Sequence, residues 1–389
     1  MIIEPANKLA HINEYYFSAK LKEIAQLRAQ GKSIINLGIG NPDMPPSEAT
    51  INALVETAKQ PNTHGYQSYI GTPELRQGLA SFYQATYNVT FNSNSEVLPL
   101  LGSKEGISFI SNAFLNPGDK VLIPNPGYPT YTSATYLAGA EPIFYNLDEQ
   151  NNWLPKLDSI DEKILNEAKL MWVNYPNMPT GSEGNIAYFE KLIAFAKKYK
   201  ILVCNDNPYS LVLNNERPMS IFHADGAKEV CIELNSLSKS HNLAGARIGM
   251  IVGDKAYIDT ILKVKSNVDS GMYLPVQAGA IAALTNNQEW HNTRNEVYKK
   301  RRTIAYQILD TLNCSYTKEQ VGMFLWAKIE DKYNNVEDLT ERILHEADVF
   351  ITPGFIFGTN GARYIRISLC STENDLQEAL KRIEKLFNI

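Results

Sequence analysis

Short apolar runs typical of β-strands alternate with longer helical patterns through roughly the first 270 residues. Within 104–115, Ile107, Ile110 and Phe114 recur at the i, i+3 and i+7 spacing of one buried helix face, and 186–199 is a second helical segment. The predicted strands are Lys120–Pro124, Leu170–Asn174, Ile201–Asn205, Val230–Leu234 and Ile248–Val252. Because both faces of these strands are apolar, they predict a mainly parallel sheet covered by helices, the core of an α/β doubly wound layer.

Long amphipathic helices with a few strands replace this alternation from about residue 275. Strands are predicted here at Phe324–Ile329 and Tyr364–Ser368. The change predicts a smaller α+β domain that the N-terminal segment completes. We therefore expect a large domain at 45–275 and a small domain formed by 1–44 with 276–389.

The composition mainly argues against certain partners and ligands. The 389 residues are 44% hydrophobic and 20% charged, with a formal net charge of −5, so we expect neither a nucleic-acid nor a membrane partner. The basic run at 299–302 is predicted to be a solvated helix face. The four scattered cysteines and the lack of a signal-peptide pattern favour a reducing, cytoplasmic compartment. The six histidines show no metal-site spacing, so we expect no metal.

The most informative stretch follows the predicted 230–234 strand and reads SLSKS at 236–240. Lys239 is flanked there by small hydroxyl residues at a strand end, where a lysine can approach a cofactor closely. Arg247, eight residues further on, is suited to phosphate because its guanidinium matches phosphate oxygens in pairs. The alternative is an exposed serine-rich loop with a solvated lysine.

A carboxylate, Asp206, follows the apolar 201–205 strand, and Tyr209 comes three residues later. A buried carboxylate is costly unless it meets a cation or several donors. The protonated ring nitrogen of pyridoxal phosphate (PLP) is such a cation, and Tyr209 could then donate to the phenolic oxygen of the same ring. The alternative is an aspartate that caps a helix beside a buried tyrosine.

Three further residues have side chains that suit a ligand. Ser103 opens a predicted helix after Gly102, and free N–H groups in a first helical turn bind anions, although any helix cap has this pattern. Tyr128, in a turn, can stack on a flat ring, although such tyrosines usually only pack. Arg366 interrupts an apolar strand and requires an anion, either an internal carboxylate or the α-carboxylate of a substrate.

These residues lie within sequence motifs whose order and spacing match those of a known protein family. The motifs are LGIGNPD at 37–43, YQSYIGTPELR at 66–76, GSKEGI at 102–107, NPGYPTY at 125–131, NYPNMPTG at 174–181, DNPY at 206–209 and SLSK at 236–239. In this order and spacing, the chain resembles, over nearly all its length, the class I aminotransferases of PLP fold type I, nearest the branch that contains LL-diaminopimelate aminotransferases.

The resemblance implies a fold, an activity and an assembly. The fold is a mainly parallel seven-stranded sheet flanked by helices, with a smaller α+β domain. The implied activity is PLP-dependent transfer of an amino group between a small L-amino acid and a 2-oxo acid by a ping-pong mechanism. The implied assembly is a homodimer with shared active sites.

The resemblance also assigns roles to single residues. Lys239 would form the internal aldimine and act as acid and base, while Asp206 would pair with the ring nitrogen and Tyr209 with the phenolic oxygen. Arg366 would bind the substrate α-carboxylate, with the backbone at Gly40 closing over it. The other implied cofactor contacts are ring stacking by Tyr128, phosphate binding by Gly102, Ser103, Lys104, Ser236 and Arg247, and a phosphate contact from Tyr66 to the neighbouring subunit.

One position departs from the family pattern. The family has an asparagine directly before Pro-Thr-Gly, and its amide donates to the phenolic oxygen of the cofactor, whereas this chain has Met178. A thioether cannot donate a hydrogen bond. Our hypothesis is that the imine nitrogen formed with Lys239 has a higher pKa here than in relatives. A local rearrangement that brings Asn177 into the position is the alternative.

Other functions and the choice of substrate stay open. The same scaffold hosts β-lyases that use the same lysine and aspartate, and a non-catalytic PLP-binding module usually carries a DNA-binding segment, which we do not expect before residue 30. The α-carboxylate contact is common to all amino acids. We expect selectivity for the side chain to come from 15–17, 66–71 and 269–275.

Overall fold

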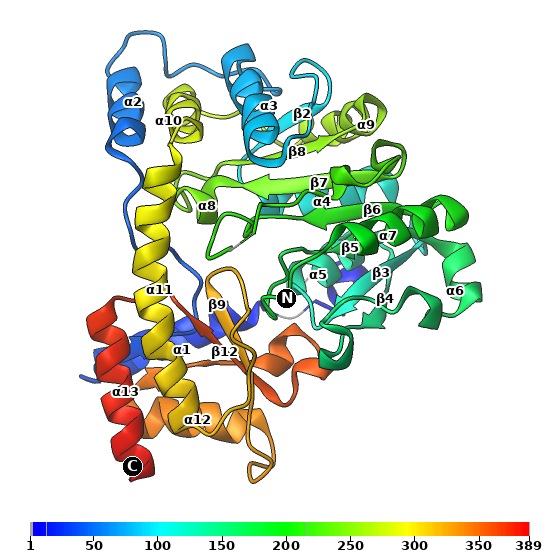
Figure 1. Ribbon diagram of the computed structural model, residues 1–389. Helices are drawn as coiled ribbons and strands as arrows, with labels where there is room; N and C mark the ends of the chain where they lie inside the picture. The colour runs from blue at the N-terminus through cyan, green and yellow to red at the C-terminus, as the bar shows by residue number, and fades with distance from the viewer. Residues whose placement is uncertain (1–2, 13, 215, 389) are drawn as a thin grey trace.

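In the computed structural model, which describes residues 3–12, 14–214 and 216–388, the chain is built around a mixed seven-stranded sheet (Figure 1). All neighbouring strands are parallel except β8, which is antiparallel to both of its neighbours. This confirms the predicted mainly parallel sheet. In spatial order the strands are β2 (Val97–Leu100), β8 (Gly249–Gly253), β7 (Cys231–Ser236), β6 (Leu202–Asp206), β5 (Ala168–Val173), β3 (Lys120–Asn125) and β4 (Glu141–Asn146).

The extent to which each strand is buried explains which strands could be predicted from the apolar pattern of the sequence. Every residue of β6, β7 and β8 is buried, and the apolar residues in each of these strands are what indicated them in the sequence. The edge strand β4 has only one buried residue, Tyr145, and the apolar pattern did not indicate it. The short strand β2 is fully buried but contains Pro99 and was also missed.

Helices cover both faces of the sheet (Figure 1). One face packs against α4 (Ser103–Phe114), α5 (Pro129–Leu137) and α9 (Lys255–Lys265). The other face packs against α3 (Pro73–Tyr87), α6 (Glu162–Glu167), α7 (Ile186–Tyr199) and α10 (Leu274–Leu284). Two more helices belong to this part of the chain, α2 (Glu48–Ala58), which contacts α10, and the one-turn α8 (Leu237–Ser240).

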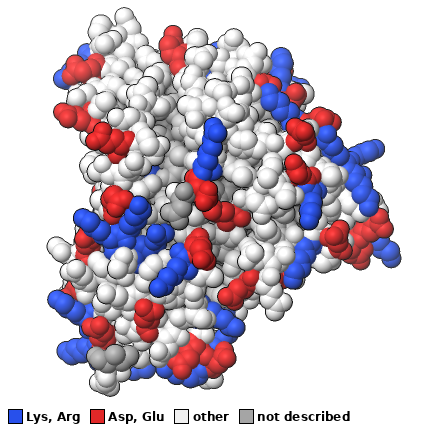
Figure 2. Space-filling view, in the orientation of Figure 1, with Lys and Arg blue, Asp and Glu red and all other residues white. Residues whose placement is uncertain are grey.

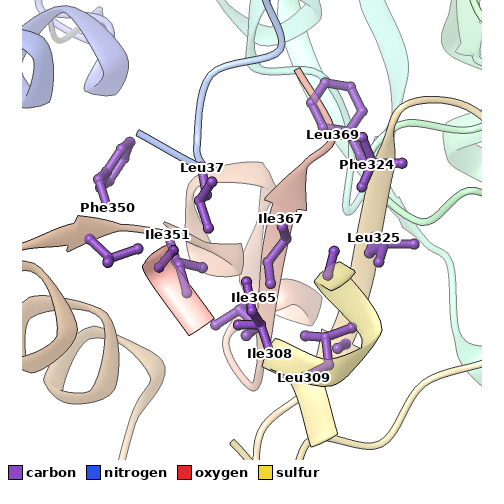
Figure 3. Packing of buried hydrophobic residues seen from close by; sticks show 14 of the residues in the cluster. Leu37, Ile308, Leu309, Phe324, Leu325, Phe350, Ile351, Ile365, Ile367 and Leu369 are labelled. Carbon is purple, nitrogen blue, oxygen red and sulfur yellow. The ribbon is translucent and has the colours of Figure 1, made fainter. Parts of the chain in front are cut away.

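A separate apolar core joins the two ends of the chain (Figure 3). Leu37 from the N-terminal segment packs there with Ile308 and Leu309 of α11 and with residues of the C-terminal strands. This grouping supports our proposal of a small domain made of 1–44 with 276–389, except that α10 packs on the large sheet. Its elements are α1 (Tyr16–Ala29), β1 (Ile35–Asn36), α11 (Gln288–Thr311), β9 (Phe324–Lys328), α12 (Val336–Ala347), β10 (Val349–Phe350), β11 (Thr352–Pro353), β12 (Tyr364–Ser368) and α13 (Glu373–Phe387).

The strands of this second core form two small sheets. The strands β11, β12 and β9 form an antiparallel three-stranded sheet in that order, and β1 pairs in parallel with β10. Short 3₁₀ helices complete the chain at Asn7–Leu9, Glu149–Asn151, Leu157–Ser159, Ile221–His223, Ala227–Glu229, Gly354–Phe357 and Thr359–Gly361.

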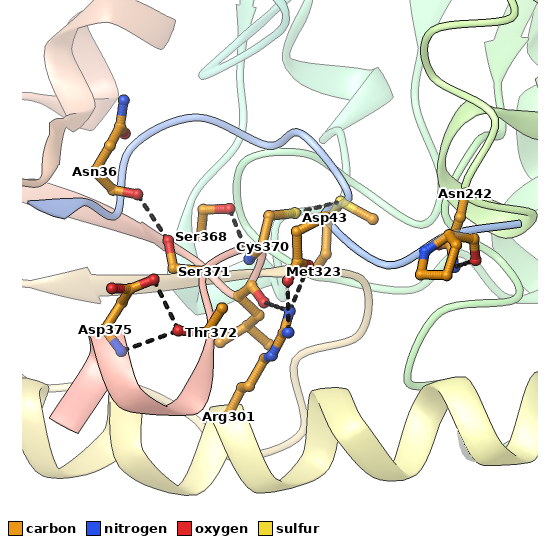
Figure 4. A network of polar contacts seen from close by, with 12 residues as sticks. Asn36, Asp43, Asn242, Arg301, Met323, Ser368, Cys370, Ser371, Thr372 and Asp375 are labelled. Carbon is orange, nitrogen blue, oxygen red and sulfur yellow. Dashed lines mark hydrogen bonds and ion pairs between the residues drawn. The ribbon is translucent and has the colours of Figure 1, made fainter.

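An ion pair fixes the segment that links the N-terminal strand to the large sheet (Figure 4). The two terminal nitrogens of Arg301, on α11, each donate to one carboxylate oxygen of Asp43 at 2.7 Å. Arg301 is buried, so the prediction that 299–302 forms a solvated helix face is wrong for this residue. Four consecutive residues span more than one turn of 3.6 residues, so one of them must face inward.

The surface carries charges of both signs. Figure 2 shows basic and acidic side chains intermingled on one face of the molecule. Among the described residues, no helix is long and apolar enough to cross a membrane. Glu23, Glu341 and His345 form a cluster of potential metal ligands, but the ammonium of Lys20 lies 2.7 Å from an oxygen of each carboxylate and supplies the positive charge there.

Candidate active site

A cavity of about 750 Å³ opens where β6 and β7 end, between the large sheet and the small-domain strands β9 and β12. Parallel sheets commonly bind ligands at this edge. The cavity brings together ten of the residues singled out in the sequence, namely Gly40, Ser103, Lys104, Tyr128, Asp206, Tyr209, Ser236, Lys239, Arg247 and Arg366. Gly102 lies against the guanidinium of Arg247, whereas Tyr66 lies outside the cavity and is 93% exposed.

Lys239 reaches the cavity from α8, the single helical turn that follows β7. The Ser236 hydroxyl accepts a hydrogen bond from the Ser238 N–H at 3.1 Å and so caps this turn. The Lys239 ammonium donates to the carbonyl of Gly40 across the cavity. Burial lowers the pKa of Lys239, because the charged form loses hydration. A lysine in this position gives up its proton more readily and can act as a nucleophile and a base.

Asp206 presents a carboxylate with one free oxygen. Its Oδ2 accepts a hydrogen bond from the Tyr131 hydroxyl at 2.9 Å. Its Oδ1 is buried and has no partner within the described part of the chain. Burial raises the pKa of Asp206 to about 7, an effect that the Tyr131 hydrogen bond partly opposes. A protonated ring nitrogen placed at the free oxygen would satisfy this carboxylate.

Arg247 packs against the start of α4, where an anion can bind. Gly102 has a φ of +87°, and a Cβ atom at this position would lie 2.3 Å from Nη2 of Arg247. Only a glycine therefore lets the guanidinium lie against the backbone here. The first turn of α4, which begins at Ser103, directs its free N–H groups to the same place. This arrangement fits a phosphate group.

Arg366, on β12, is a buried cation without a carboxylate partner among the described residues. Its Nη2 donates to the Gly38 carbonyl at 2.7 Å and its Nη1 donates to the sulfur of Met178 at 3.2 Å, whereas its Nε has no hydrogen-bond partner in residues 3–12, 14–214 and 216–388. Three rings surround it, with centres 3.9 to 5.4 Å from Cζ, and these belong to Phe324, Phe357 and Phe17. Burial lowers the pKa of Arg366 to about 10. The described part of the chain offers Arg366 no internal carboxylate of the kind considered from the sequence, and the site suits an external anion.

Met178 lines the cavity in a buried position, and Asn177 does not. The side-chain oxygen of Asn177 accepts hydrogen bonds from the N–H and the hydroxyl of Thr180 at 3.3 and 2.7 Å. Its amide nitrogen donates to the carbonyl of Asn174 at 3.2 Å. The local rearrangement considered from the sequence is therefore not present, because Asn177 is committed to its own turn.

Several residues of the cavity wall were not singled out in the sequence. The most important is Tyr131, whose spacing of three from Tyr128 on α5 was the available signal. Tyr15 and Phe17 line the cavity as expected for part of the substrate wall. The loops at 66–71 and 269–275 do not line it within a single chain.

Comparisons with known proteins agree with this geometry. Residues 32–383 match the model of the family described as aminotransferase class I and II. The chain is 39% identical over 379 residues to the LL-diaminopimelate aminotransferase of Dehalococcoides mccartyi strain BAV1, which covers 97% of each chain. It is 38% identical over 386 residues to that of Aquifex aeolicus, covering 99% of this chain and 100% of the relative. The substrate-bound structure of BacF from Bacillus subtilis has a TM-score of 0.94 and 36% identity, and the match covers 99% of this chain and 98% of that one.

Proposed function

The chain belongs to the aminotransferase class I and II family and transfers amino groups with PLP, and from this premise we propose that its 750 Å³ cavity is the active site and Lys239 its catalytic residue. The observation that carries the proposal is the convergence of three charged groups on this cavity. They are the free oxygen of Asp206, the guanidinium of Arg247 above a helix start, and the unpaired nitrogen of Arg366. Each suits a different part of a PLP–substrate pair.

The large-domain residues hold the cofactor in this proposal. PLP, when bound, withdraws electrons from the substrate α-carbon and so makes its proton acidic. Asp206 binds the ring nitrogen through Oδ1, and Tyr209 donates to the phenolic oxygen. The phosphate and the ring face are bound by Gly102, Ser103, Lys104, Ser236, Arg247 and Tyr128.

Lys239 moves the proton in this proposal. Its lowered pKa favours the neutral amine, which takes a proton from the substrate α-carbon and returns it on the same side of the cavity. The carbonyl of Gly40, which accepts from the Lys239 ammonium, orients Nζ for this task.

The substrates are an L-amino acid and a 2-oxo acid, which bind in turn in a ping-pong mechanism. Arg366 binds the α-carboxylate that both share, because its unpaired Nε and its two terminal nitrogens form a fork that matches a carboxylate. LL-diaminopimelate is the first donor to test, since it is the substrate in the names of the relatives. A role in amino-acid biosynthesis follows if that donor is correct.

The assembly in this proposal is a homodimer that shares its active sites. Tyr66 is 93% exposed and lies outside the cavity of its own chain, which suits a residue that binds the phosphate of the neighbouring subunit. Lys239→Ala and Tyr66→Ala proteins should each be nearly inactive. A refolded mixture of the two should regain activity, because a hybrid dimer has one intact site. No regain would contradict the shared site.

The compartment we propose is a reducing one, the cytoplasm. The four cysteines are all free, and each is buried in the structure. Buried thiols of this kind act as small apolar side chains. Their state in freshly purified protein can be measured by thiol titration after unfolding.

The test of the proposed function is a half-reaction with the PLP-loaded protein. A panel of amino acids that includes LL-diaminopimelate is expected to give stoichiometric 2-oxo acid with at least one donor. Borohydride reduction followed by peptide mass spectrometry is expected to place the cofactor on Lys239, and the Lys239→Ala protein should carry none. Release of pyruvate with ammonia, without stoichiometric exchange, would indicate a β-lyase instead.

A further inference from the structure

Tyr131 is the one described side chain that hydrogen-bonds the carboxylate of Asp206. It lies on α5 and is completely buried, and its hydroxyl donates to Oδ2 of Asp206 at 2.9 Å. The other carboxylate oxygen, Oδ1, is therefore left for the cavity, which Asp206 lines. A carboxylate held by one oxygen cannot rotate freely, so the direction of the other oxygen is set by the donor.

Aromatic packing fixes the position of the Tyr131 hydroxyl. The ring stacks on Trp172 of β5, with centres 4.9 Å apart and planes inclined by 4°. Its other neighbour is Tyr128, whose ring meets it edge-on at 5.6 Å and 86°. Tyr128 is the residue directly before α5, and Tyr131 lies three residues later in its first turn. The helix thus places a ring for the cofactor face and a hydroxyl for the aspartate as one unit.

We propose that Tyr131 is a positioning residue for the cofactor, holding Oδ2 of Asp206 so that Oδ1 meets the ring nitrogen of PLP. This inference rests on the proposed function, because it requires PLP to bind with its ring nitrogen at Asp206. The hydroxyl also stabilises the ionised carboxylate against the effect of burial. Without it, Asp206 loses both its orientation and part of its charge, and the ring nitrogen loses its partner.

The test is the Tyr131→Phe variant, which keeps the ring that stacks on Trp172 and removes only the hydroxyl. The dissociation constant is measured by titrating cofactor-free protein with PLP and, separately, with 1-deazapyridoxal phosphate, in which C–H replaces the ring nitrogen. PLP affinity should fall about tenfold, the effect of losing one hydrogen bond to a charged group. Affinity for the deaza analogue should change less than about twofold, because it has no ring nitrogen for Asp206 to bind.

The matched control is Tyr145→Phe. Tyr145 is also a buried tyrosine, and its hydroxyl donates to the Trp172 carbonyl at 2.6 Å without contacting Asp206 or lining the cavity. This variant should leave both affinities unchanged, so that any loss of stability from removing a buried hydroxyl is accounted for. In the Asp206→Asn background, Tyr131→Phe should add no further loss of PLP affinity.

Two results would overturn the inference. An equal loss for PLP and for the deaza analogue would mean that Tyr131 only supports the fold of the cavity. An unchanged PLP affinity would mean that Asp206 is positioned without it. A wild-type protein that shows no saturable PLP binding would contradict the proposed function itself, whatever the Tyr131 variant does.

Discussion

The two walls of the cavity each bury a charge with an unpaired atom, but they hold it differently. On the cofactor wall, formed by the large sheet, Asp206 is held by a hydroxyl and leaves Oδ1 free. On the substrate wall, formed by the small-domain strands and α1, Arg366 is held by a carbonyl and a thioether among aromatic rings and leaves Nε free. The signs are opposite, so the first wall is built for a cation and the second for an anion.

The comparison shows which groups of the empty protein can contribute free energy to ligand binding. A buried charge without a full set of partners destabilises the empty protein, and a ligand of opposite charge removes that cost when it binds. Asp206 has a directional donor behind it, which favours one orientation of a flat ring. Arg366 has two acceptors behind it, the Gly38 carbonyl and the Met178 sulfur, and the surrounding aromatic rings stabilise its positive charge. Both walls therefore orient their charge by hydrogen bonds, and they differ mainly in the sign of the ligand charge that they bind.

The largest effect is expected from removing the charge of the substrate wall. Arg366→Met should lower kcat/KM for amino acids by roughly 100-fold or more, since one partner of a buried charge pair is lost. PLP affinity should stay within about twofold of wild type, because the cofactor wall is intact. The matched control is Arg363→Met, just before β12, whose arginine lies 3.4 Å from the exposed Asp331 and outside the cavity. Equal losses in both variants would contradict the comparison.

The next effect concerns the charge of the cofactor wall and depends on pH. Burial raises the pKa of Asp206 from 3.8 to about 7 in the cofactor-free protein. Between these pH values the folded state binds one more proton than the unfolded state, so the free energy of unfolding falls as pH rises from about 4 to about 7. Cofactor-free Asp206→Asn lacks this effect and should be more stable than wild type at pH 8, by a few kcal/mol.

Denaturant unfolding at pH 4 and at pH 8 measures this difference. The stability gap between wild type and Asp206→Asn should be wide at pH 8 and nearly closed at pH 4. The same variant should bind PLP more weakly, so stability and affinity move in opposite directions. An equal gap at both pH values would show that the buried carboxylate is compensated in the empty protein.

The sequence revealed the cofactor wall better than the substrate wall, and the reason is local. Asp206 ends a strand and Lys239 follows one shortly after, so each is marked by the apolar run before it. The rings around Arg366 come from Phe17, Phe324 and Phe357, on three segments that only tertiary packing brings together. No periodic pattern of one segment contains that arrangement.

The hydrogen-bond partners of buried side chains also could not be predicted from the sequence. Tyr131 could be placed near Tyr128 from its spacing of three, but its bond to Asp206 depends on how α5 packs beside β6. The burial of Arg301 depends in the same way on where Asp43 lies. Whether a segment forms a helix or a strand follows from its local pattern, whereas the hydrogen-bond partners of its side chains follow from how whole elements pack together.

A smaller effect on the cofactor wall is expected from Gly102→Ala. The new Cβ would lie 2.3 Å from Nη2 of Arg247 and would push the guanidinium away from the start of α4. PLP affinity should fall about tenfold as phosphate contacts weaken. Gly118→Ala is the matched control, because its φ of +84° is similar to the +87° of Gly102 and nothing lies within 4 Å of the added atom. Both variants should lose similar stability, and only the first should lose affinity.

The smallest effect is expected where the two walls meet, at Met178. Its sulfur accepts a hydrogen bond from Arg366 of the substrate wall, and it lines the cavity where, in our proposal, the phenolic oxygen of PLP would lie. A thioether cannot donate to that oxygen, so Tyr209 is the remaining donor. Met178→Asn adds a second donor and favours the ionised phenolic oxygen, which should lower the pKa at which the absorbance of the bound cofactor changes.

The expected shift is about half a unit, because one neutral hydrogen bond contributes about 1 kcal/mol or less and a full unit corresponds to 1.36 kcal/mol. A spectroscopic pH titration of wild type and variant measures it. Asn177→Ser is the control, since the Asn177 side chain bonds only to Thr180 and Asn174 and does not line the cavity. That control should leave the transition in place. If Met178→Asn also leaves the pH of this transition unchanged, the phenolic oxygen already has its full set of hydrogen bonds. Met178 would then have no effect on the bonding of the cofactor.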